Sequence, residues 1–219
     1  MAGRWILAAF GAVTVGVTVA YLLTEPLLGP GDRVLLIGDS LAVGLGNSPA
    51  YGSASALSHD LAAAEVQLVA RGEGATTSLQ WSGTGHLNQE RLRPALAAGV
   101  RAVVVVLGTN DCHYDYGHCP PFRERVLAIA REIRAAGATP VLVAMPPMPW
   151  ESNRDGAERM RYALEAMRHA ANETGGIFID RPRFEIPRWP DRLHPNPEGA
   201  RLWSKYIVDQ LASARRWKG

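Results

Sequence analysis

The sequence predicts an α/β fold in which helices cover both faces of a five-stranded parallel sheet, in three layers. Five short runs rich in Val, Ile and Leu alternate with stretches long enough to be crossover helices. Each run is continuously apolar rather than alternating, which is typical of strands that are buried on both faces. Repeated units of strand and helix form a parallel sheet.

The expected strands follow one another along the chain, with helical segments between and after them. The strands are expected at 33–37, 66–70, 102–107, 140–144 and 177–179, and the helices at 55–64, 89–98, 122–136, 157–172 and 197–214. Gly99, Gly137 and Gly175 stand where helix C-caps belong. Ligands of such sheets bind beyond the carboxyl ends of the strands, so the residues directly after each strand are the candidate functional residues.

The composition fits one globular domain preceded by a different N-terminal segment. The 219 residues are 47% hydrophobic and 20% charged, and a net charge of +2 provides no basic field for a nucleic acid partner. Residues 1–30 contain only two charged side chains, those of Arg4 and Glu25. We therefore divide the chain into a membrane anchor or signal peptide with a tether, at 1–30, and a globular domain at 31–219.

Residues 5–23 form an uncharged run that is long enough to cross a bilayer. As a helix this run would be ~28 Å long, close to the ~30 Å hydrocarbon core. A cleaved signal peptide is the alternative, but the run exceeds the usual ~7–15 residues, and cleavage after Ala20 would split it. Arg4 precedes the run and Glu25 follows it, so the positive-inside rule predicts an anchored protein with an extracytoplasmic domain. If the segment is cleaved, the domain is secreted.

A candidate nucleophile follows the first expected strand. Ser40 precedes a glycine-containing helix start, but a serine hydroxyl is a poor nucleophile until an imidazole takes its proton. His194 is the best base among the six histidines, because Asp191 lies three residues before it on a segment flanked by proline. At that spacing the Asp191 carboxylate can reach Nδ1 and leave Nε2 to accept the serine proton.

Acyl transfer also needs hydrogen-bond donors for the oxyanion. Gly74 offers an unshielded backbone N–H and Asn110 offers a side-chain amide, and both follow expected strands. Together with the Ser40 N–H they would form an oxyanion hole of three donors. Taken singly, a turn glycine and a loop-stabilising asparagine are the simpler interpretations, but the combined set favours catalysis.

These segments resemble, in order, the four motif blocks of the SGNH (GDSL-type) hydrolases. The Gly-Asp-Ser of residues 38–40 is similar to the nucleophile block, and Gly74 to the glycine block. The Gly-Thr-Asn-Asp of residues 108–111 is similar to the asparagine block, and Asp191-x-x-His194 to the terminal dyad. The resemblance covers about residues 33–208.

The resemblance implies a flavodoxin-like sheet, catalysis by Ser40, His194 and Asp191, and an oxyanion hole of Ser40, Gly74 and Asn110. No segment of the sequence calls for a cofactor or a metal ion. The glycine block departs from the family pattern, because it lacks the asparagine that the family often has two or three residues earlier. Gly72 is therefore a competitor for the role of Gly74, although alignment on the following threonine favours Gly74.

Two cysteines bracket a loop that directly follows the asparagine block. In an extracytoplasmic domain Cys112 and Cys119 favour a disulfide, which would contribute about 2.5 kcal/mol on the chain-entropy model. The rival is a metal site formed by these cysteines with His113 and His118. That cluster lacks the usual separation of paired ligands, so we expect the disulfide.

The expected function is that of a serine esterase acting on short-acyl (O-acetyl) esters of envelope or extracellular carbohydrate. The alternatives are a lysophospholipase or thioesterase for longer acyl chains, an acyltransferase with the same triad, and a non-catalytic ligand-binding module. The loops after the strands include the aromatic residues Trp81, Trp150, Phe184 and Trp189. Such side chains can stack on sugar rings or line an acyl channel, or serve only as packing anchors.

Overall fold

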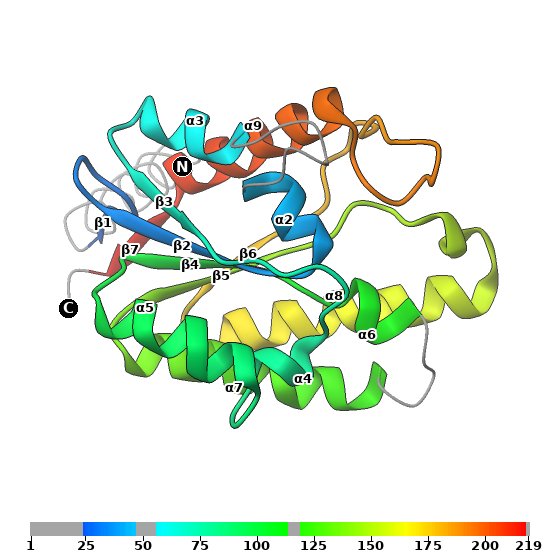
Figure 1. The fold of residues 1–219 in the computed structure, drawn as a ribbon, viewed down its shortest axis with the longest axis horizontal. Coiled ribbons are helices and arrows are strands. Elements are labelled where there is room, and N and C mark those ends of the chain that lie inside the picture. Colours follow the sequence, from blue (N-terminus) through cyan, green and yellow to red (C-terminus); the bar gives the residue numbers. More distant parts are fainter. Residues whose placement is uncertain (1–23, 47–55, 114–118, 218–219) are drawn as a thin grey trace, which may run out of the picture.

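The computed structural model describes residues 24–46, 56–113 and 119–217. At its centre is a parallel sheet of five strands, in the order β3-β2-β4-β5-β6 (Figure 1). The strands are β2 (Arg33–Gly38), β3 (Gln67–Ala70), β4 (Ala102–Val106), β5 (Thr139–Val143) and β6 (Ile177–Ile179). The predicted five-stranded parallel sheet is confirmed, and each strand begins and ends within one residue of its expected bounds.

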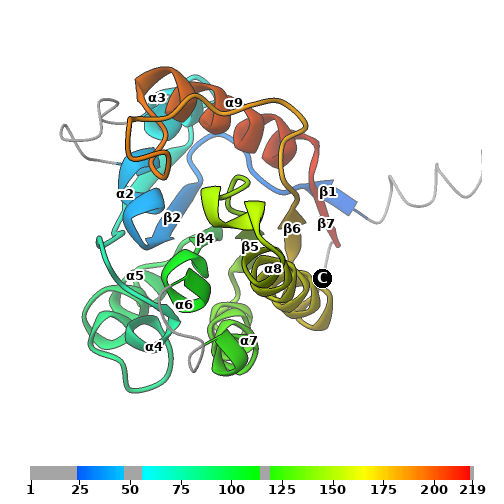
Figure 2. The same cartoon turned by 90° about the vertical axis from the view of Figure 1, so that its right-hand side faces the viewer.

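Helices cover both faces of this sheet, which gives the expected three layers (Figures 1 and 2). One face carries α3 (Ala56–Ala62) and α9 (Pro197–Ser213), and the other carries α5 (Arg93–Ala97), α7 (Cys119–Ala135) and α8 (Arg154–Thr174). Shorter helical segments are α2 (Ser40–Gly46), α4 (Ser78–Trp81), α6 (Thr109–His113), the π-helical η2 (Asn88–Leu92) and the 3-10 helix η3 (Pro149–Ser152).

The side-chain pattern explains why these segments form the layers. All five residues of β4 are buried, and its four consecutive valines suit a pleated strand covered on both faces. On α7 the buried residues Phe122, Val126, Ile129 and Ile133 recur every three or four positions, so they form one apolar stripe against the sheet.

The strand order places a crevice between β2 and β4. Counted along the sheet, the order is that of flavodoxin-like folds, in which the first and third strands are neighbours and the chain changes direction between them. The connections that leave these two strands diverge to opposite faces, and ligands of such folds bind at that point. Ser40 follows β2 and Asn110 follows β4, so both stand at this switch point.

Two short strands join the ends of the described chain. β1 (Thr24–Pro26) pairs antiparallel with β7 (Arg215–Trp217), and the Leu27 N–H donates to the Ala214 carbonyl at 3.0 Å. Leu27 is fully buried, so residues assigned to the tether from sequence pack against the domain. A three-residue strand depends on its distant partner, which local sequence patterns do not reveal.

The expected N-terminal transmembrane helix at 5–23 lies outside the residues that the structure describes. Within the described ranges, no helix has both the length and the apolar character needed to cross a membrane.

Candidate active site

Ser40 stands at the carboxyl end of β2, where the strand turns directly into α2. Gly38 makes this turn possible, because its φ is +145° and a Cβ there would lie 2.0 Å from the Val106 carbonyl oxygen. Asp39 then caps the helix start, since its Oδ1 accepts a hydrogen bond from the Leu41 N–H at 2.9 Å. The local sequence therefore holds Ser40 above the sheet edge.

Residues 187–196 form a loop that folds back on itself between β6 and α9, here called the 187–196 hairpin. Arg188 and Pro195 form an antiparallel bridge, and the Trp189 N–H donates to the His194 carbonyl at 3.0 Å. The Arg192 N–H donates to the Trp189 carbonyl at 2.8 Å and closes the turn. These bonds fix the conformation of a segment that has no helix or regular sheet of its own.

Asp191 accepts three hydrogen bonds within the hairpin, two of them from His194. Its Oδ2 lies 2.8 Å from Nδ1 of the His194 ring, and its Oδ1 accepts from the backbone N–H groups of Leu193 and His194 at 2.9 and 3.0 Å. Partial burial alone would raise the pKa of Asp191, but these hydrogen bonds outweigh it and lower the pKa below its usual value. Asp191 is therefore an ionised acceptor at neutral pH.

The other ring nitrogen of His194 faces the serine. Nε2 lies 2.9 Å from Ser40 Oγ, across 154 positions of the sequence. The structure thus brings together the three residues that the sequence singles out as nucleophile, base and orienting carboxylate. With Nδ1 donating to Asp191, Nε2 is left as an acceptor for the serine proton.

The two glycines of the glycine block occupy different surroundings. A Cβ on Gly72 would lie 3.1 Å from Val43 N and from the Ala42 side chain, so Gly72 allows close packing against α2. A Cβ on Gly74 would meet only the Ser40 Cβ, at 4.0 Å. Gly74 is therefore the glycine that lies beside Ser40.

Asn110 lies in the first turn of α6, on the far side of the switch point from Ser40. Its Nδ2 donates one hydrogen bond to the Thr76 carbonyl at 2.8 Å, which ties α6 to the loop that contains Gly74. The second N–H of this amide has no partner within the described ranges and is available to a ligand.

Two carboxyl groups are fully buried beneath this site, a feature for which the sequence carries no signal beyond their position at strand ends. Asp111 accepts hydrogen bonds from the Ser78 N–H and, at 2.5 Å, from the Ser78 hydroxyl. Burial raises the pKa of Asp111 despite these bonds. Burial also raises the pKa of Asp39 to about 7, opposed by the Leu41 hydrogen bond and reinforced by the nearby charge of Asp111.

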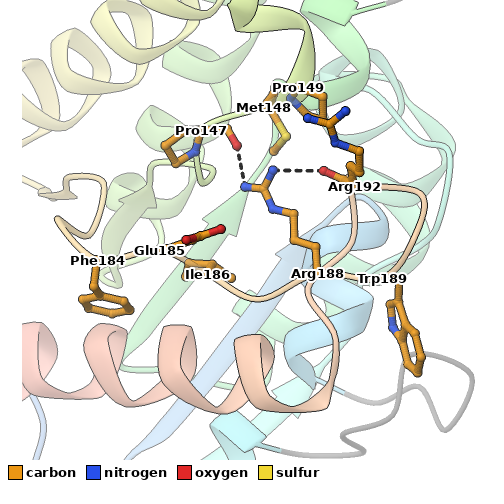
Figure 3. Close-up of a pocket in the computed structure, with 9 residues that line it drawn as sticks. All are labelled: Pro147, Met148, Pro149, Phe184, Glu185, Ile186, Arg188, Trp189 and Arg192. Carbon is orange, nitrogen blue, oxygen red and sulfur yellow. Dashed lines mark hydrogen bonds between the residues drawn. The ribbon is translucent and has the colours of Figure 1, made fainter.

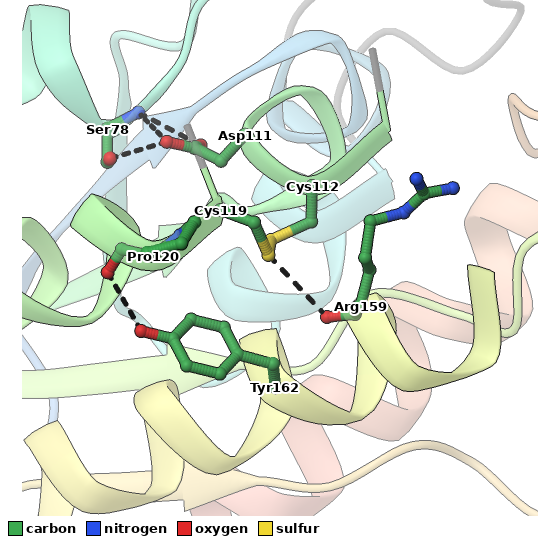
Figure 4. Close-up of a disulfide and its surroundings, with 7 residues drawn as sticks. All are labelled: Ser78, Asp111, Cys112, Cys119, Pro120, Arg159 and Tyr162. Atoms are coloured by element: carbon green, nitrogen blue, oxygen red, sulfur yellow. Dashed lines mark hydrogen bonds between the residues drawn. A yellow bond between two sulfur atoms is a disulfide. The ribbon is translucent and has the colours of Figure 1, made fainter. Parts of the chain in front are cut away.

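The predicted disulfide between Cys112 and Cys119 is present (Figure 4). It joins the last turn of α6 to the first residue of α7, with the two Cα atoms 4.6 Å apart. Both sulfurs are used in the S–S bond, so neither is a thiolate ligand, and the described part of the chain contains no cluster of His, Cys, Asp and Glu that could hold a metal ion. His118 of the rival metal site lies outside the described residues.

The four aromatic residues divide into two packing anchors and two exposed side chains. Trp81 is fully buried and its Nε1 donates to the Thr76 hydroxyl at 3.1 Å, while Trp150 stacks on the His113 ring with centroids 3.8 Å apart. Phe184 and Trp189 are 43% and 38% exposed and line one pocket. Of the four, these two are the most exposed to a ligand.

Comparison with known proteins connects this geometry to a family. Residues 36–202 match the model of the GDSL-like lipase/acylhydrolase family, which is more than half of the chain. No curated protein matches the chain at a significant level.

Several solved structures have the same fold at low sequence identity. A psychrotrophic esterase from Pseudoalteromonas sp. is 18% identical, with a TM-score of 0.63 and coverage of 81% of this chain and 95% of that one. An acetylxylan esterase from Geobacillus stearothermophilus is 15% identical, with a TM-score of 0.64 and coverage of 87% and 98%. A carbohydrate acetylesterase from Sinorhizobium meliloti is 20% identical, with a TM-score of 0.64 and coverage of 83% and 99%.

The family match extends from β2, before Ser40, to α9, after His194, and so includes every candidate site residue named above. The chain belongs to the GDSL-like lipase/acylhydrolase family and is an ester-hydrolysing enzyme of the SGNH type.

Proposed function

We propose that this protein is a serine esterase that hydrolyses short-acyl carboxylic esters through an acyl-enzyme on Ser40. The observation that carries the proposal is the hydrogen-bonded series from Asp191 through His194 to Ser40, with distances of 2.8 and 2.9 Å. A non-catalytic binding module would have no use for a base oriented in this way.

In the acylation step, His194 Nε2 takes the Ser40 proton as Oγ attacks the ester carbonyl carbon. The carbonyl electron pair moves onto oxygen, where the N–H groups of Ser40 and Gly74 and the second N–H of Asn110 are the donors. When the tetrahedral intermediate collapses, the C–O bond to the alcohol breaks and the alcohol takes the proton from His194. Asp191 stabilises the transient imidazolium without itself taking the proton.

In the deacylation step, water replaces the alcohol. His194 takes a proton from water as its oxygen attacks the acyl carbon, and Ser40 then leaves and regains its proton while the carboxylic acid departs. An acyltransferase would use an acceptor alcohol in place of water at this step. Gas or liquid chromatography of the products, with and without an added sugar acceptor, distinguishes the two reactions.

The proposed substrates are short-acyl, chiefly O-acetyl, esters of envelope or extracellular carbohydrate. Two of the structural neighbours are described as an acetylxylan esterase and a carbohydrate acetylesterase, which supports this class. We expect nitrophenyl acetate or butyrate to be the best substrate in a series of nitrophenyl esters from acetyl to palmitoyl. An optimum at the long chains would favour a lysophospholipase or thioesterase instead.

Labelling with a fluorophosphonate probe tests the nucleophile. The wild-type protein should be labelled, and Ser40→Ala should not. Ser213→Ala is a matched control, because Ser213 is an exposed serine at the end of α9, and its labelling should equal that of the wild type. An unlabelled wild type, or a labelled Ser40→Ala, would overturn the assignment.

We also propose that residues 5–23 anchor the enzyme in a membrane with the domain outside the cytoplasm. β1 and the Arg101 side chain, which donates to the Leu27 carbonyl at 3.1 Å, hold residue 24 near the start of β4. That edge is opposite the carboxyl ends of the strands, so an anchored domain would turn its active site away from the bilayer (Figure 1). Protease protection of the full chain in sealed membrane vesicles tests this topology, and release of the domain by carbonate washing would contradict it.

A further inference from the structure

A pocket beside the 187–196 hairpin lies outside the catalytic residues (Figure 3). It is lined by residues 147–149, 184–186, 188–189 and 192, and its volume is about 430 Å³. This volume falls in the ~300–1,000 Å³ range of small-molecule sites. Ser40 and the two residues that follow it do not line the pocket. The pocket therefore suits a part of the substrate that lies beyond the scissile bond.

The pocket gathers exposed aromatic side chains. In the described part of the chain three large apolar side chains are exposed, those of Leu79, Phe184 and Trp189, and two of them line this one pocket. Figure 3 shows Phe184 and Trp189 at its two ends. Phe184 is held by an edge-on contact with Tyr206 of α9, whose ring centroid lies 5.8 Å away. Apolar faces left open to water in this arrangement are typical of ligand contacts.

Besides apolar side chains at 147–149 and 186, the pocket wall contains three charged side chains, those of Glu185, Arg188 and Arg192, which favours a ligand that is not purely hydrocarbon. Arg188 crosses the pocket and donates to the Pro147 carbonyl and, at 3.0 Å, to the Arg192 carbonyl. Glu185 and Arg192 are exposed, and their side chains have no hydrogen-bond partner among the residues described. Hydrocarbon offers these groups no hydrogen bond, whereas hydroxyl groups can bond to both a carboxylate and a guanidinium.

The pocket lies next to Asp191 and His194, because it shares a hairpin with them. Arg188, Trp189 and Arg192 belong to the hairpin that contains Asp191 and His194. A ligand with apolar ring faces and hydroxyl groups at its rim matches both kinds of wall, and a sugar ring is such a ligand.

We propose that this pocket is the subsite for a sugar ring of the alcohol part of the substrate. Phe184 and Trp189 contact the sugar from the two ends of the pocket, and Glu185 and Arg192 bind its hydroxyl groups. The subsite thereby selects carbohydrate esters over esters of simple alcohols. The inference rests on the proposed esterase function for its kinetic consequence, but not for binding of the sugar itself.

The kinetic test compares kcat/KM for acetylated xylotetraose with kcat/KM for vinyl acetate, whose alcohol is too small to reach the pocket. The double variant Phe184→Ala/Trp189→Ala should lower the ratio of the two constants about tenfold, because each lost ring contact removes a stacking interaction. Arg192→Gln should lower it in the same direction. Equal losses on both substrates, or no loss, would overturn the subsite.

Two matched controls lie outside the pocket. Leu79→Ala removes the third exposed apolar side chain, and Arg201→Gln removes an exposed arginine of α9. Both should leave the ratio of the two constants as it is in the wild type.

A binding test separates this inference from the proposed function. Ser40→Ala protein titrated with unacetylated xylotetraose should show a saturable change in tryptophan fluorescence, and Arg192→Gln in the same background should weaken the binding severalfold. If the wild type hydrolyses no ester but this binding is seen, the esterase proposal fails and the sugar subsite stands. If vinyl acetate is hydrolysed but no sugar binds, the esterase proposal stands and the subsite fails.

Discussion

The proposed nucleophile and the proposed base belong to two regions that are held in place by different means. Ser40 lies next to a buried region: Asp39 beside it and Asp111 in the neighbouring α6 are both fully buried. The 187–196 hairpin carries Asp191 and His194 on an exposed loop that is held by a few hydrogen bonds, and the Asp191 side chain is 47% exposed. The buried region is positioned by the sheet and the exposed one by its own local bonds.

This difference predicts how each region responds to change. A substitution in the hairpin should reduce turnover with little effect on stability, because few apolar contacts are lost. A substitution at the buried side should affect stability as well as turnover, because its carboxyl groups are shielded from water and bond to neighbouring segments, as Asp111 does to Ser78.

The largest expected effect is on turnover and comes from the hairpin. His194→Ala removes the base, so kcat for nitrophenyl acetate should fall by roughly 10⁴-fold or more, while the midpoint of urea unfolding stays near that of the wild type. Stopped-flow or steady-state kinetics together with urea titration measure both quantities. A loss of less than tenfold would show that another group acts as the base.

Asn110→Ala should have the next largest effect on turnover. Loss of one oxyanion donor lowers kcat by roughly 10²–10³-fold. Because the Asn110 amide also bonds to the Thr76 carbonyl, the variant should unfold at lower urea concentration than His194→Ala does. Equal stabilities of the two variants would contradict the distinction between the buried and the exposed region.

Removal of the disulfide should act on stability more than on chemistry. Cys112→Ser/Cys119→Ser should lower the free energy of unfolding by about 2.5 kcal/mol, measured by denaturant titration. Dithiothreitol should destabilise the wild type by a similar amount and leave the double variant unchanged. If dithiothreitol destabilised the double variant further, the loss of stability would not be due to the Cys112–Cys119 disulfide.

The smallest expected effect is a pH dependence that distinguishes the two aspartates. Burial raises the pKa of Asp39 to about 7, above the ~3.9 of an unfolded chain, so the folded state binds more protons between these values. Stability from this group therefore falls as pH rises from about 4 to about 7. Relative to the wild type, Asp39→Asn should gain about 3 °C or more in Tm between pH 5 and pH 8.

Asp191→Asn is the control for this pH experiment. The pKa of Asp191 is lowered, so the stability it contributes is present above the unfolded pKa and is lost only as pH falls below it. In a His194→Ala background, which removes the neighbouring imidazole, adding Asp191→Asn should change Tm by the same amount at pH 5 and at pH 8. A constant difference for Asp39→Asn as well would show that Asp39 does not titrate in this range.

The sequence alone was enough to predict the parallel sheet and to single out Ser40, Asp191 and His194. Continuous apolar runs indicate strands that are buried on both faces, and short motifs indicate roles through their local chemistry. The sheet and the candidate triad can therefore be predicted without coordinates. The disulfide was also predicted, on the expectation of an extracytoplasmic domain, in which two cysteines in a short segment favour a disulfide.

Tertiary structure alone decided what depends on contacts between distant segments. Gly74 lies beside Ser40, whereas Gly72 packs against other residues of α2. Phe184 and Trp189 are exposed, whereas Trp81 is buried. The pairing of β1 with β7 and the burial of Asp39 and Asp111 likewise arise from residues far apart in the chain. Local patterns determine which segments become strands and which residues carry chemistry, but packing determines which side chains remain open to a substrate, because burial is a property of the assembled layers.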